Sequence, residues 1–380
     1  MYPPGEKAEA QSTVAPSSPS PPYSDAVNYA RKEPSRYSPR NWKRRTWIVI
    51  SVVVVVIVVG AIVGGILGAK ATAYPDYYRI DYQLTDSYEG RNFFDQFEYF
   101  TGDDPTKGAI VYTNASYSDK LNLTQVTWTN TAILRVDTND KNATSGRRSV
   151  RITSKKTYDR GLFIFDVLHA PYGCATWPAL WLTDANNWPD NGEIDVIETI
   201  NNAASGNRVA LHTTKGCEIG KHRKRKQIGR ALSHDCYNAT KGNQGCAVQG
   251  PPWSAGEQFN ANGGGVYAAE LRTEGIRVWF FARADIPSDI KDAPDPSTWP
   301  DPLADFPNLE CDITDHFKNQ SIVANIDLCG WAGQRGVYPS EVCTESCGDW
   351  VAFKGESFDE AYWEFNGFWV YYGEEAKEIP

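Results

Sequence analysis

One long apolar run stands out in the first fifth of the chain. It covers residues 47–69, contains no charged side chain, and consists largely of Val and Ile. A helix rises about 1.5 Å per residue, so a run of this length can cross the bilayer core of about 30 Å. A buried strand is the poorer interpretation, because strands seldom exceed about ten residues. The run therefore predicts one transmembrane helix.

The pattern changes to short alternating runs from about residue 78 onward. β-branched and aromatic residues recur in segments bounded by Gly, Asn, Asp and Pro, which is typical of strands joined by turns. No stretch shows a convincing helical period. The clearest runs are SVRITS, GLFIFDVLH, EIDVIETI, RVALHTT, GVYAAEL, GIRVWFFA and FWVYY. This pattern predicts an all-β sandwich or barrel that ends near residue 372.

Residues that flank the apolar run predict the topology of the chain. Seven Lys and Arg residues lie between positions 31 and 45, whereas the far side begins with Lys70 and then mixes both signs. By the positive-inside rule the N-terminus stays cytosolic, and the run is too long and too late for a cleaved signal peptide. We expect a single-pass type II membrane protein. Its predicted parts are a disordered cytosolic tail (1–45), a signal anchor (46–70), a linker (71–77), a catalytic domain (78–372) and a C-terminal tail (373–380).

Charge and composition narrow the function. The net charge of -9 and the pI near 5.2 argue against a nucleic-acid partner, since phosphate binding needs a basic face. The basic run 221–226 is an exception, and we interpret it as a solvated loop, with a processing site or an anionic surface as alternatives. Aromatic residues make up 13% of the chain, which suits strands and exposed ring surfaces.

Cysteines and glycosylation sequons predict an oxidising compartment. All eight cysteines lie between Cys174 and Cys347, and their uneven spacing favours disulfides over a zinc site. Five Asn-x-Ser/Thr sequons follow the apolar run, at Asn114, Asn122, Asn142, Asn238 and Asn319. Both features favour passage through the secretory pathway, with the predicted domain in its lumen or outside the cell.

The segment with the most informative chemistry is EIDVIE, which contains Glu193, Asp195 and Glu198. Alternate side chains share one face of a strand, so Glu193 and Asp195 point together while Glu198 would point to the other side. A β-bulge near Val196 or Ile197 would add the residue that returns Glu198 to the shared face. The spacing therefore predicts a bulge.

Paired carboxyl groups of this kind suit a retaining glycosidase. One group attacks the anomeric carbon, and the other protonates the leaving oxygen, at a separation of about 5 to 5.5 Å. Crowding of three acids favours a proton on one of them, which keeps a neutral acid opposite an ionised nucleophile. A solvated acidic face or a calcium site remains the alternative for the triplet alone.

The wider context resembles glycoside hydrolase family 16, and within it the fungal laminarinase-type endo-β-1,3(4)-glucanases. The motifs that carry this resemblance lie between residues 78 and 372, and they include WPALWL, NWPDNGEIDVIE, LHTTKGC, FNANGGGVYAAE and IVANIDLCGWAG. The resemblance implies a concanavalin-like β-jelly roll with a substrate cleft across its concave sheet. It also implies a retaining double displacement that needs no cofactor and no metal at the catalytic site.

The resemblance assigns roles to seven residues. Glu193 is expected to be the nucleophile, Glu198 the general acid/base, and Asp195 the residue that bonds to the nucleophile. Trp181, Trp188 and Trp331 are similar to cleft tryptophans that pack on sugar rings, although a single Trp can equally be a core residue. His212 is expected to bond a carboxylate or a sugar hydroxyl, with a purely structural histidine as the alternative.

Three functions are compatible with these motifs. The first is a retaining endo-β-glucanase that acts on β-1,3 or mixed β-1,3/1,4-glucan in cell-wall remodelling. The second is a transglycosylase that uses the same residues but passes the glycosyl group to a sugar hydroxyl. The third is a non-catalytic glucan-binding protein of wall assembly, which the complete acid triplet disfavours.

Overall fold

The computed structural model describes residues 39–71, 74–220 and 226–374. The predicted disordered tail therefore lies almost wholly outside the described residues, as do most of the basic run 221–226 and of the C-terminal tail. The chain divides between Gly68 and Ala69 into two compact units.

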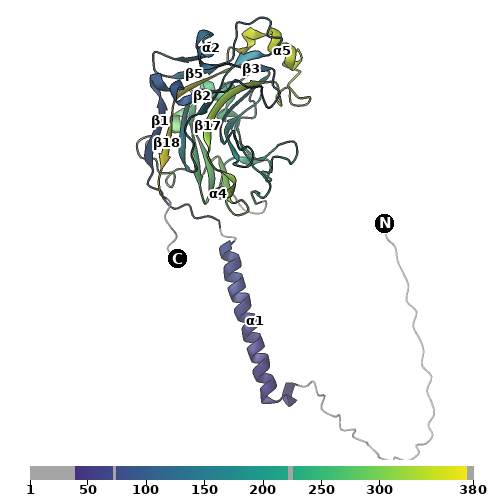
Figure 1. The fold of residues 1–380 in the computed structure, drawn as a ribbon. Coiled ribbons are helices and arrows are strands. Elements are labelled where there is room, and N and C mark those ends of the chain that lie inside the picture. Colours follow the sequence, from purple (N-terminus) through teal and green to yellow (C-terminus); the bar gives the residue numbers. More distant parts are fainter. Residues whose placement is uncertain (1–38, 72–73, 221–225, 375–380) are drawn as a thin grey trace, which may run out of the picture. The chain divides into compact units, whose positions relative to one another are not determined.

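The first unit contains all but the last three residues of one long helix, α1 (Arg44–Ala71), preceded by a single 3-10 turn, η1 (Pro39–Asn41). The predicted apolar run lies within α1, and Figure 1 shows it as one continuous helix. Its span Arg44–Gly65 has a mean hydropathy of 3.1 and no residue buried in protein. By length and composition α1 can cross a membrane.

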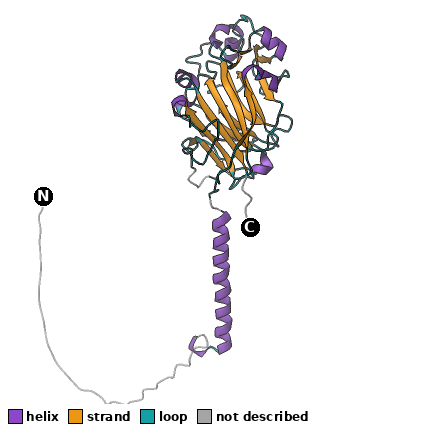
Figure 2. Cartoon of the chain, turned by 90° about the vertical axis from the view of Figure 1, so that its left-hand side faces the viewer, coloured by secondary structure: helices purple, strands orange, loops and turns teal. Residues whose placement is uncertain are grey.

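The second unit is built on two antiparallel sheets of eight strands each (Figure 2). The β14 sheet has the order β16-β15-β14-β8-β18-β5-β4, with β1 also paired to β18. Its strands are β1 (Gln83–Glu89), β4 (Thr124–Val126), β5 (Ala132–Arg135), β8 (Gly161–His169), β14 (Gly265–Arg272), β15 (Gly275–Ala282), β16 (Ala304–Pro307) and β18 (Tyr362–Tyr372).

The β10 sheet has the order β12-β13-β11-β10-β9-β17-β7-β2. Its strands are β2 (Phe97–Tyr99), β7 (Arg151–Ser154), β9 (Thr176–Thr183), β10 (Glu193–Glu198), β11 (Arg208–His212), β12 (Arg230–Ala231), β13 (Cys246–Gln249) and β17 (Ser321–Leu328). A separate parallel pair joins β3 (Ile110–Tyr112) to β6 (Arg147–Ser149). Short helices close the ends of the unit: α2 (Ala115–Lys120), α3 (Gly256–Ala261), α4 (Ile313–His316) and α5 (Cys347–Phe353).

The main hydrophobic core lies between the two sheets, because alternate residues of each strand point inward. Ile194 of β10 and Leu182 of β9 meet Tyr267 and Leu271 of β14 in this one cluster. The opposite face of β10 is thereby left for Glu193 and Asp195. Of the sandwich and the barrel that the alternating runs predict as alternatives, the structure forms the sandwich.

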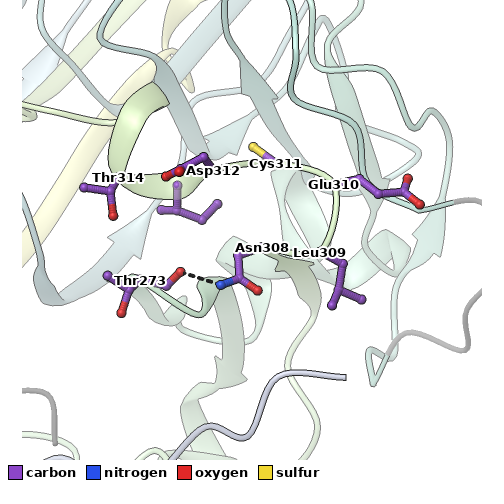
Figure 3. A pocket seen from close by; sticks show the side chains of 8 residues that line it. Thr273, Asn308, Leu309, Glu310, Cys311, Asp312 and Thr314 are labelled. Carbon is purple, nitrogen blue, oxygen red and sulfur yellow. Dashed lines mark hydrogen bonds between the residues drawn. The ribbon is translucent and has the colours of Figure 1, made fainter. Parts of the chain in front are cut away.

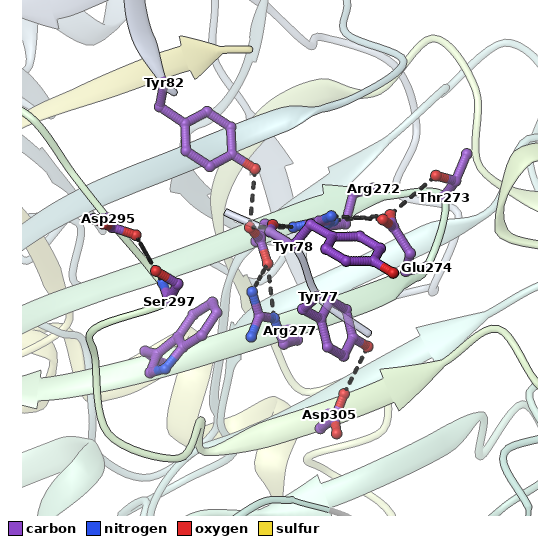
Figure 4. Close-up of polar contacts among 12 residues, drawn as sticks. Tyr77, Tyr78, Tyr82, Arg272, Thr273, Glu274, Arg277, Asp295, Ser297 and Asp305 are labelled. Atoms are coloured by element: carbon purple, nitrogen blue, oxygen red, sulfur yellow. Dashed lines mark hydrogen bonds and ion pairs between the residues drawn. The ribbon is translucent and has the colours of Figure 1, made fainter. Parts of the chain in front are cut away.

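A second, smaller core covers the outer face of the β14 sheet. Ile80 and Tyr82 pack there against Leu162, Trp279 and other residues of that sheet. The segment before them belongs to the predicted linker, yet the hydroxyl of Tyr77 donates to Asp305 Oδ1 at 3.0 Å (Figure 4). Residues 77–82 thus lie on the sheet as an added layer.

This outer layer closes over a buried network of charges, also drawn in Figure 4. Glu270 is only 1% exposed and accepts hydrogen bonds from the Arg277 guanidinium, with Nε at 2.7 Å. The Tyr82 hydroxyl donates to the other oxygen of Glu270 at 2.9 Å. A buried carboxylate is tolerated only when it is paired and hydrogen-bonded, and Tyr82 supplies part of that pairing.

All eight cysteines form disulfides, so the expected oxidising chemistry is confirmed and the zinc alternative is wrong. Cys343 and Cys347, which are only four residues apart, bond to different partners, one 169 and the other 18 residues away. The pairs are Cys174–Cys343, Cys217–Cys311, Cys236–Cys246 and Cys329–Cys347.

Candidate active site

The acidic strand β10 contains the predicted bulge. Against β9, Asp195 pairs with Trp181, but the next partners are Ile197 with Leu180 and Glu198 with Ala179, so the register shifts by one residue. The extra residue on β10 is Val196. Because positions 181 and 179 of β9 share a face, the shift brings Glu198 onto the face of Asp195.

His212 lies beside two of the three acids. Its strand β11 pairs with β10, and Glu193 is directly opposite His212 in that register. The imidazole Nε2 is 3.3 Å from Asp195 Oδ2 and 4.0 Å from Glu193 Oε1. Burial lowers the pKa of His212, but the hydrogen bond to Asp195 and the neighbouring carboxylates outweigh it and raise the pKa to about 9.

Donor atoms of Glu193, Asp195 and His212 lie within 4.8 Å of one another, which is also close enough to surround a cation. The hydrogen bond from the imidazole to Asp195 accounts for this spacing without one. Calcium, the ion considered as an alternative for the triplet, prefers six to eight oxygen ligands and does not suit an imidazole.

Trp188 contacts the first acid of the triplet. Its indole Nε1 donates to Glu193 Oε2 at 2.6 Å, while the ring remains 41% exposed. The loop that carries Trp188 is tied by Asp184, which accepts from the side chains of Asn187 and Asn191, both at 2.8 Å. Burial and the charge of Asp195 raise the pKa of Glu193.

Glu198 is held through both of its carboxyl oxygens. Trp177 Nε1 donates to Oε1 at 3.0 Å, and Arg208 Nη1 donates to Oε2 at 2.7 Å. Burial and Asp195 raise the pKa of this buried carboxyl, and Arg208 opposes them. Neither Trp177 nor Arg208 was among the predicted site residues. Trp177 could have been found, since it precedes Trp181 by four residues and so shares its face of the strand.

The two other predicted tryptophans flank the acids. Trp181 donates through Nε1 to Asn325 Oδ1 at 2.8 Å, and its ring lies 4.9 Å from the guanidinium carbon of Arg151. Trp331 packs edge-on against Trp177, with ring centroids 5.8 Å apart. The structure therefore brings together all seven predicted residues along the same face of the β10 sheet and at its border.

A separate hollow lies next to α4 (Figure 3) and contains none of the predicted site residues. Its wall is largely polar, and Asn308 donates to the carbonyl of Thr273 across it at 3.0 Å. The chemistry of the molecule is therefore concentrated on the β10 sheet rather than in this hollow.

Comparison with known proteins identifies the fold and its relatives. A family model described as the XgeA-like catalytic GH16 domain matches residues 97–371. A probable glycosidase of Schizosaccharomyces pombe is 43% identical over 78% of this chain and 71% of its own length. A probable endo-1,3(4)-beta-glucanase of Aspergillus niger is 40% identical over 76% of this chain, but the match spans only 40% of that relative.

Two solved structures are similar over nearly their whole length. Laminarinase 16A from Phanerochaete chrysosporium, solved with beta-glucans in donor and acceptor sites, is 40% identical, with a TM-score of 0.73 over 77% of this chain and 99% of that one. An elongating GH family 16 beta-1,3-glucosyltransferase is also 40% identical, with a TM-score of 0.71 over 77% and 100%. The expected jelly-roll fold is confirmed by these neighbours.

Proposed function

The chain belongs to glycoside hydrolase family 16, and from that premise we propose that its β10 site hydrolyses β-1,3 or mixed β-1,3/1,4 linkages of glucan with retention of configuration. One observation carries the proposal. Two long acids, Glu193 and Glu198, lie on one face of a bulged strand, with Asp195 between them and a buried imidazole beside them. The names of the endo-glucanase and laminarinase relatives support the choice of substrate.

In the first half of the proposed reaction Glu193 is the nucleophile. Its carboxylate attacks the anomeric carbon, the bond from that carbon to the glycosidic oxygen breaks, and Glu198 gives its proton to the departing oxygen. The charge of Asp195 raises the pKa of Glu193, whereas the protonated His212 lowers it and so favours the attacking carboxylate. The raised pKa of Glu198, caused by burial and by Asp195, favours the protonated form that this step needs.

In the second half the glycosyl ester is broken. A water molecule attacks the anomeric carbon, and Glu198, now a carboxylate, takes a proton from this water. The bond from the anomeric carbon to Glu193 breaks, and Glu193 leaves as a carboxylate. Two displacements at one carbon restore its configuration. Trp188, Trp181 and Trp331 are proposed to pack on glucose rings, because the C–H faces of sugars suit aromatic surfaces.

Transglycosylation is the second candidate, and a specific observation favours it. The elongating β-1,3-glucosyltransferase is as similar in sequence to this chain as the laminarinase is. Both reactions share the first half, and they differ only in whether water or a sugar hydroxyl accepts the glycosyl group.

We also propose the arrangement of the chain around this site. A cytosolic tail (1–45), a signal anchor (46–70) and a linker (71–77) precede the catalytic domain (78–372), which lies outside the cell or in the secretory lumen. The apolar helix α1, the basic residues before it and the four disulfides support a type II topology. Such an anchor confines the enzyme to glucan near its own membrane, which suits remodelling of the cell's own wall.

The test uses the full chain in detergent, incubated with laminarin and with a mixed-linkage glucan, beside the Glu193→Gln variant. Short oligosaccharides from the wild type alone would establish a hydrolase and its linkage preference. Products longer than the substrate would favour transglycosylation. Unchanged glucan with correctly folded protein would refute both and leave the glucan-binding role.

A further inference from the structure

Arg208 is a buried cation that the proposed reaction has not yet used. Its side chain is 15% exposed, and its Nη1 lies 2.7 Å from Oε2 of Glu198, itself 10% exposed. Since Trp177 already donates to the other oxygen, the carboxyl group is fixed from both sides. A charged hydrogen bond of this length is among the stronger ones in proteins.

Arg208 is itself held by a loop that a disulfide closes. Cys236 and Cys246 bond to each other and bracket residues 237–245. The carbonyl of Gln244 in this loop accepts a hydrogen bond from Arg208 Nη2. The guanidinium therefore bridges the loop and Glu198, and its ring neighbour is Trp331, 5.6 Å from the guanidinium carbon.

The same loop also positions His212. Asn243 Oδ1 lies 2.9 Å from His212 Nδ1. The loop therefore holds one ring nitrogen of His212, while the other, Nε2, contacts Asp195. Gly245 has a φ of +63°, and a Cβ at that position would lie 2.8 Å from His212 Cε1. Arg208 and His212 are therefore both held by one loop, which directly precedes β13.

We propose that Arg208 is a positioning residue that aims Glu198 at the glycosidic oxygen and stabilises the carboxylate that Glu198 becomes when its proton leaves, with the 237–245 loop holding Arg208 in place. This inference rests on the proposed function, and it adds a residue and a loop that the family resemblance did not name.

The charge changes of the two half-reactions explain why a fixed cation belongs here. When the glycosidic bond breaks, Glu198 gains a negative charge near Asp195, and the charged imidazole of His212 lies on the side of Asp195 and Glu193. Arg208 is the cation in direct contact with Glu198 among the described residues. Its interaction strengthens as the proton leaves, which is the property that distinguishes transition-state stabilisation from simple binding.

The groups facing Glu198 define how its titration should respond. They are Asp195 and Glu193 from its own strand, Trp177 from β9, and Arg208 and His212 from β11. Without the Arg208 charge, burial and the charge of Asp195 favour the protonated acid, and His212 and the neutral Trp177 donor oppose them. The pH at which the enzyme loses its general acid should therefore rise.

The decisive variants are Arg208→Met, which removes the charge, and Arg208→Lys, which keeps a charge but loses the forked contact to the loop. Arg283→Met is the matched control, because Arg283 is a half-buried arginine that directly follows β15 and pairs at 2.7 Å with Asp166 of β8. All are measured as the full chain in detergent, with kcat/KM on laminarin followed across pH. Circular dichroism and thermal unfolding verify the folding of each variant.

We expect Arg208→Met to move the basic limb of the profile upward by about one pH unit or more. Its kcat should fall by about tenfold or more, because part of the general-acid contribution is lost. Arg208→Lys should keep the limb near its wild-type position with a smaller loss of kcat, and Arg283→Met should match the wild type. A folded Arg208→Met enzyme with an unmoved basic limb would overturn the proposal.

A second substrate keeps the test decisive if Arg208→Met does not fold. An aryl β-laminaribioside has a good leaving group, whose oxygen needs little protonation. Arg208→Lys should therefore lose far less activity on this substrate than on laminarin. Equal losses on both substrates would overturn the proposal. Glu198→Gln distinguishes failure of the proposed function from failure of the Arg208 proposal. An inactive wild type would refute the proposed function. If the wild type is active and Glu198→Gln is inactive, the function stands and the Arg208 variants test only the role of Arg208.

Discussion

The buried imidazole of His212 should set the low-pH limit of activity, and His212→Gln tests this. Glutamine is close in size and can still donate to Asp195, but it has no charge. In the native site the charged ring lies 4.0 Å from Glu193 Oε1. At an effective dielectric constant of about 20, two unit charges at that distance attract by about 4 kcal/mol.

That energy corresponds to a pKa change of about three units, since one unit equals about 1.36 kcal/mol. Relaxation and entry of water reduce it, so we expect the pKa of Glu193 to rise by about one to three units. A nucleophile with a higher pKa becomes protonated at a higher pH. The acidic limb of the kcat/KM profile should therefore move upward, and the basic limb should move less.

The assay is the initial rate on laminarin at low substrate concentration from about pH 3 to pH 9, because kcat/KM then reports the free enzyme. Asn243→Ala is the control, since it removes the Nδ1 partner at 2.9 Å but leaves the imidazole charge. It should shift the acidic limb much less. An acidic limb that stays in place in folded His212→Gln would refute the assignment of charge to His212.

The same cation also makes stability depend on pH. The folded pKa of His212, about 9, exceeds its ordinary value of 6.5, so folding favours the protonated form. This stabilisation is complete below about pH 6.5 and is lost as the pH rises through about 9, a change of about 3 kcal/mol. Denaturant unfolding of wild type and His212→Gln at several pH values should show this slope only in the wild type.

Three further predictions concern the site, the outer face and the compartment. Trp188→Phe keeps an aromatic ring but loses the N–H that donates to Glu193 at 2.6 Å, so kcat/KM on laminarin should fall by about tenfold. Trp188→Ala removes the ring as well and should also raise KM. Glu270→Gln removes the buried charge that pairs with Arg277 and should lower the free energy of unfolding, measured in denaturant, by about 3 to 5 kcal/mol. The activity of the folded enzyme should stay unchanged, because Glu270 lies on the outer face of the β14 sheet, away from the β10 site. Treatment with an endoglycosidase should reduce the apparent mass of the chain made in a eukaryotic host, since its five sequons lie in exposed or half-exposed positions; an unchanged mass on a denaturing gel would contradict the lumenal placement.

The outer layer on the β14 sheet was not visible in the sequence. Residues 71–77 are predicted to be a linker because they contain no alternating run, yet Tyr77 donates to buried Asp305 of β16, 228 residues away. Tyr82, shortly after the predicted linker, donates to buried Glu270 of β14, 188 residues away. A contact between one tyrosine and one acid so far apart leaves no local pattern. Only the folded sheet brings them together.

The disulfides also combine a property that the sequence predicts with one that only the fold decides. Eight cysteines after an apolar run predict that bridges form, because the compartment decides this. Their pairing follows from the fold, since Cys343 and Cys347 are close in sequence but bond to Cys174 and Cys329. The loop that holds both cations of the site depends on one of these pairings, Cys236–Cys246.

The features that the chain order alone predicts are local. The length of the apolar run predicts a membrane helix, and the two-residue period of a strand, together with one extra residue at Val196, predicts that Glu193, Asp195 and Glu198 share a face. The electrostatic surroundings of the two glutamates arise only when the strands come together. Burial between strands and the approach of Trp177, Arg208 and His212 from β9 and β11 shift the pKa values of Glu193 and Glu198, because electrostatic energy depends on distance in space and on exclusion of water rather than on position along the chain.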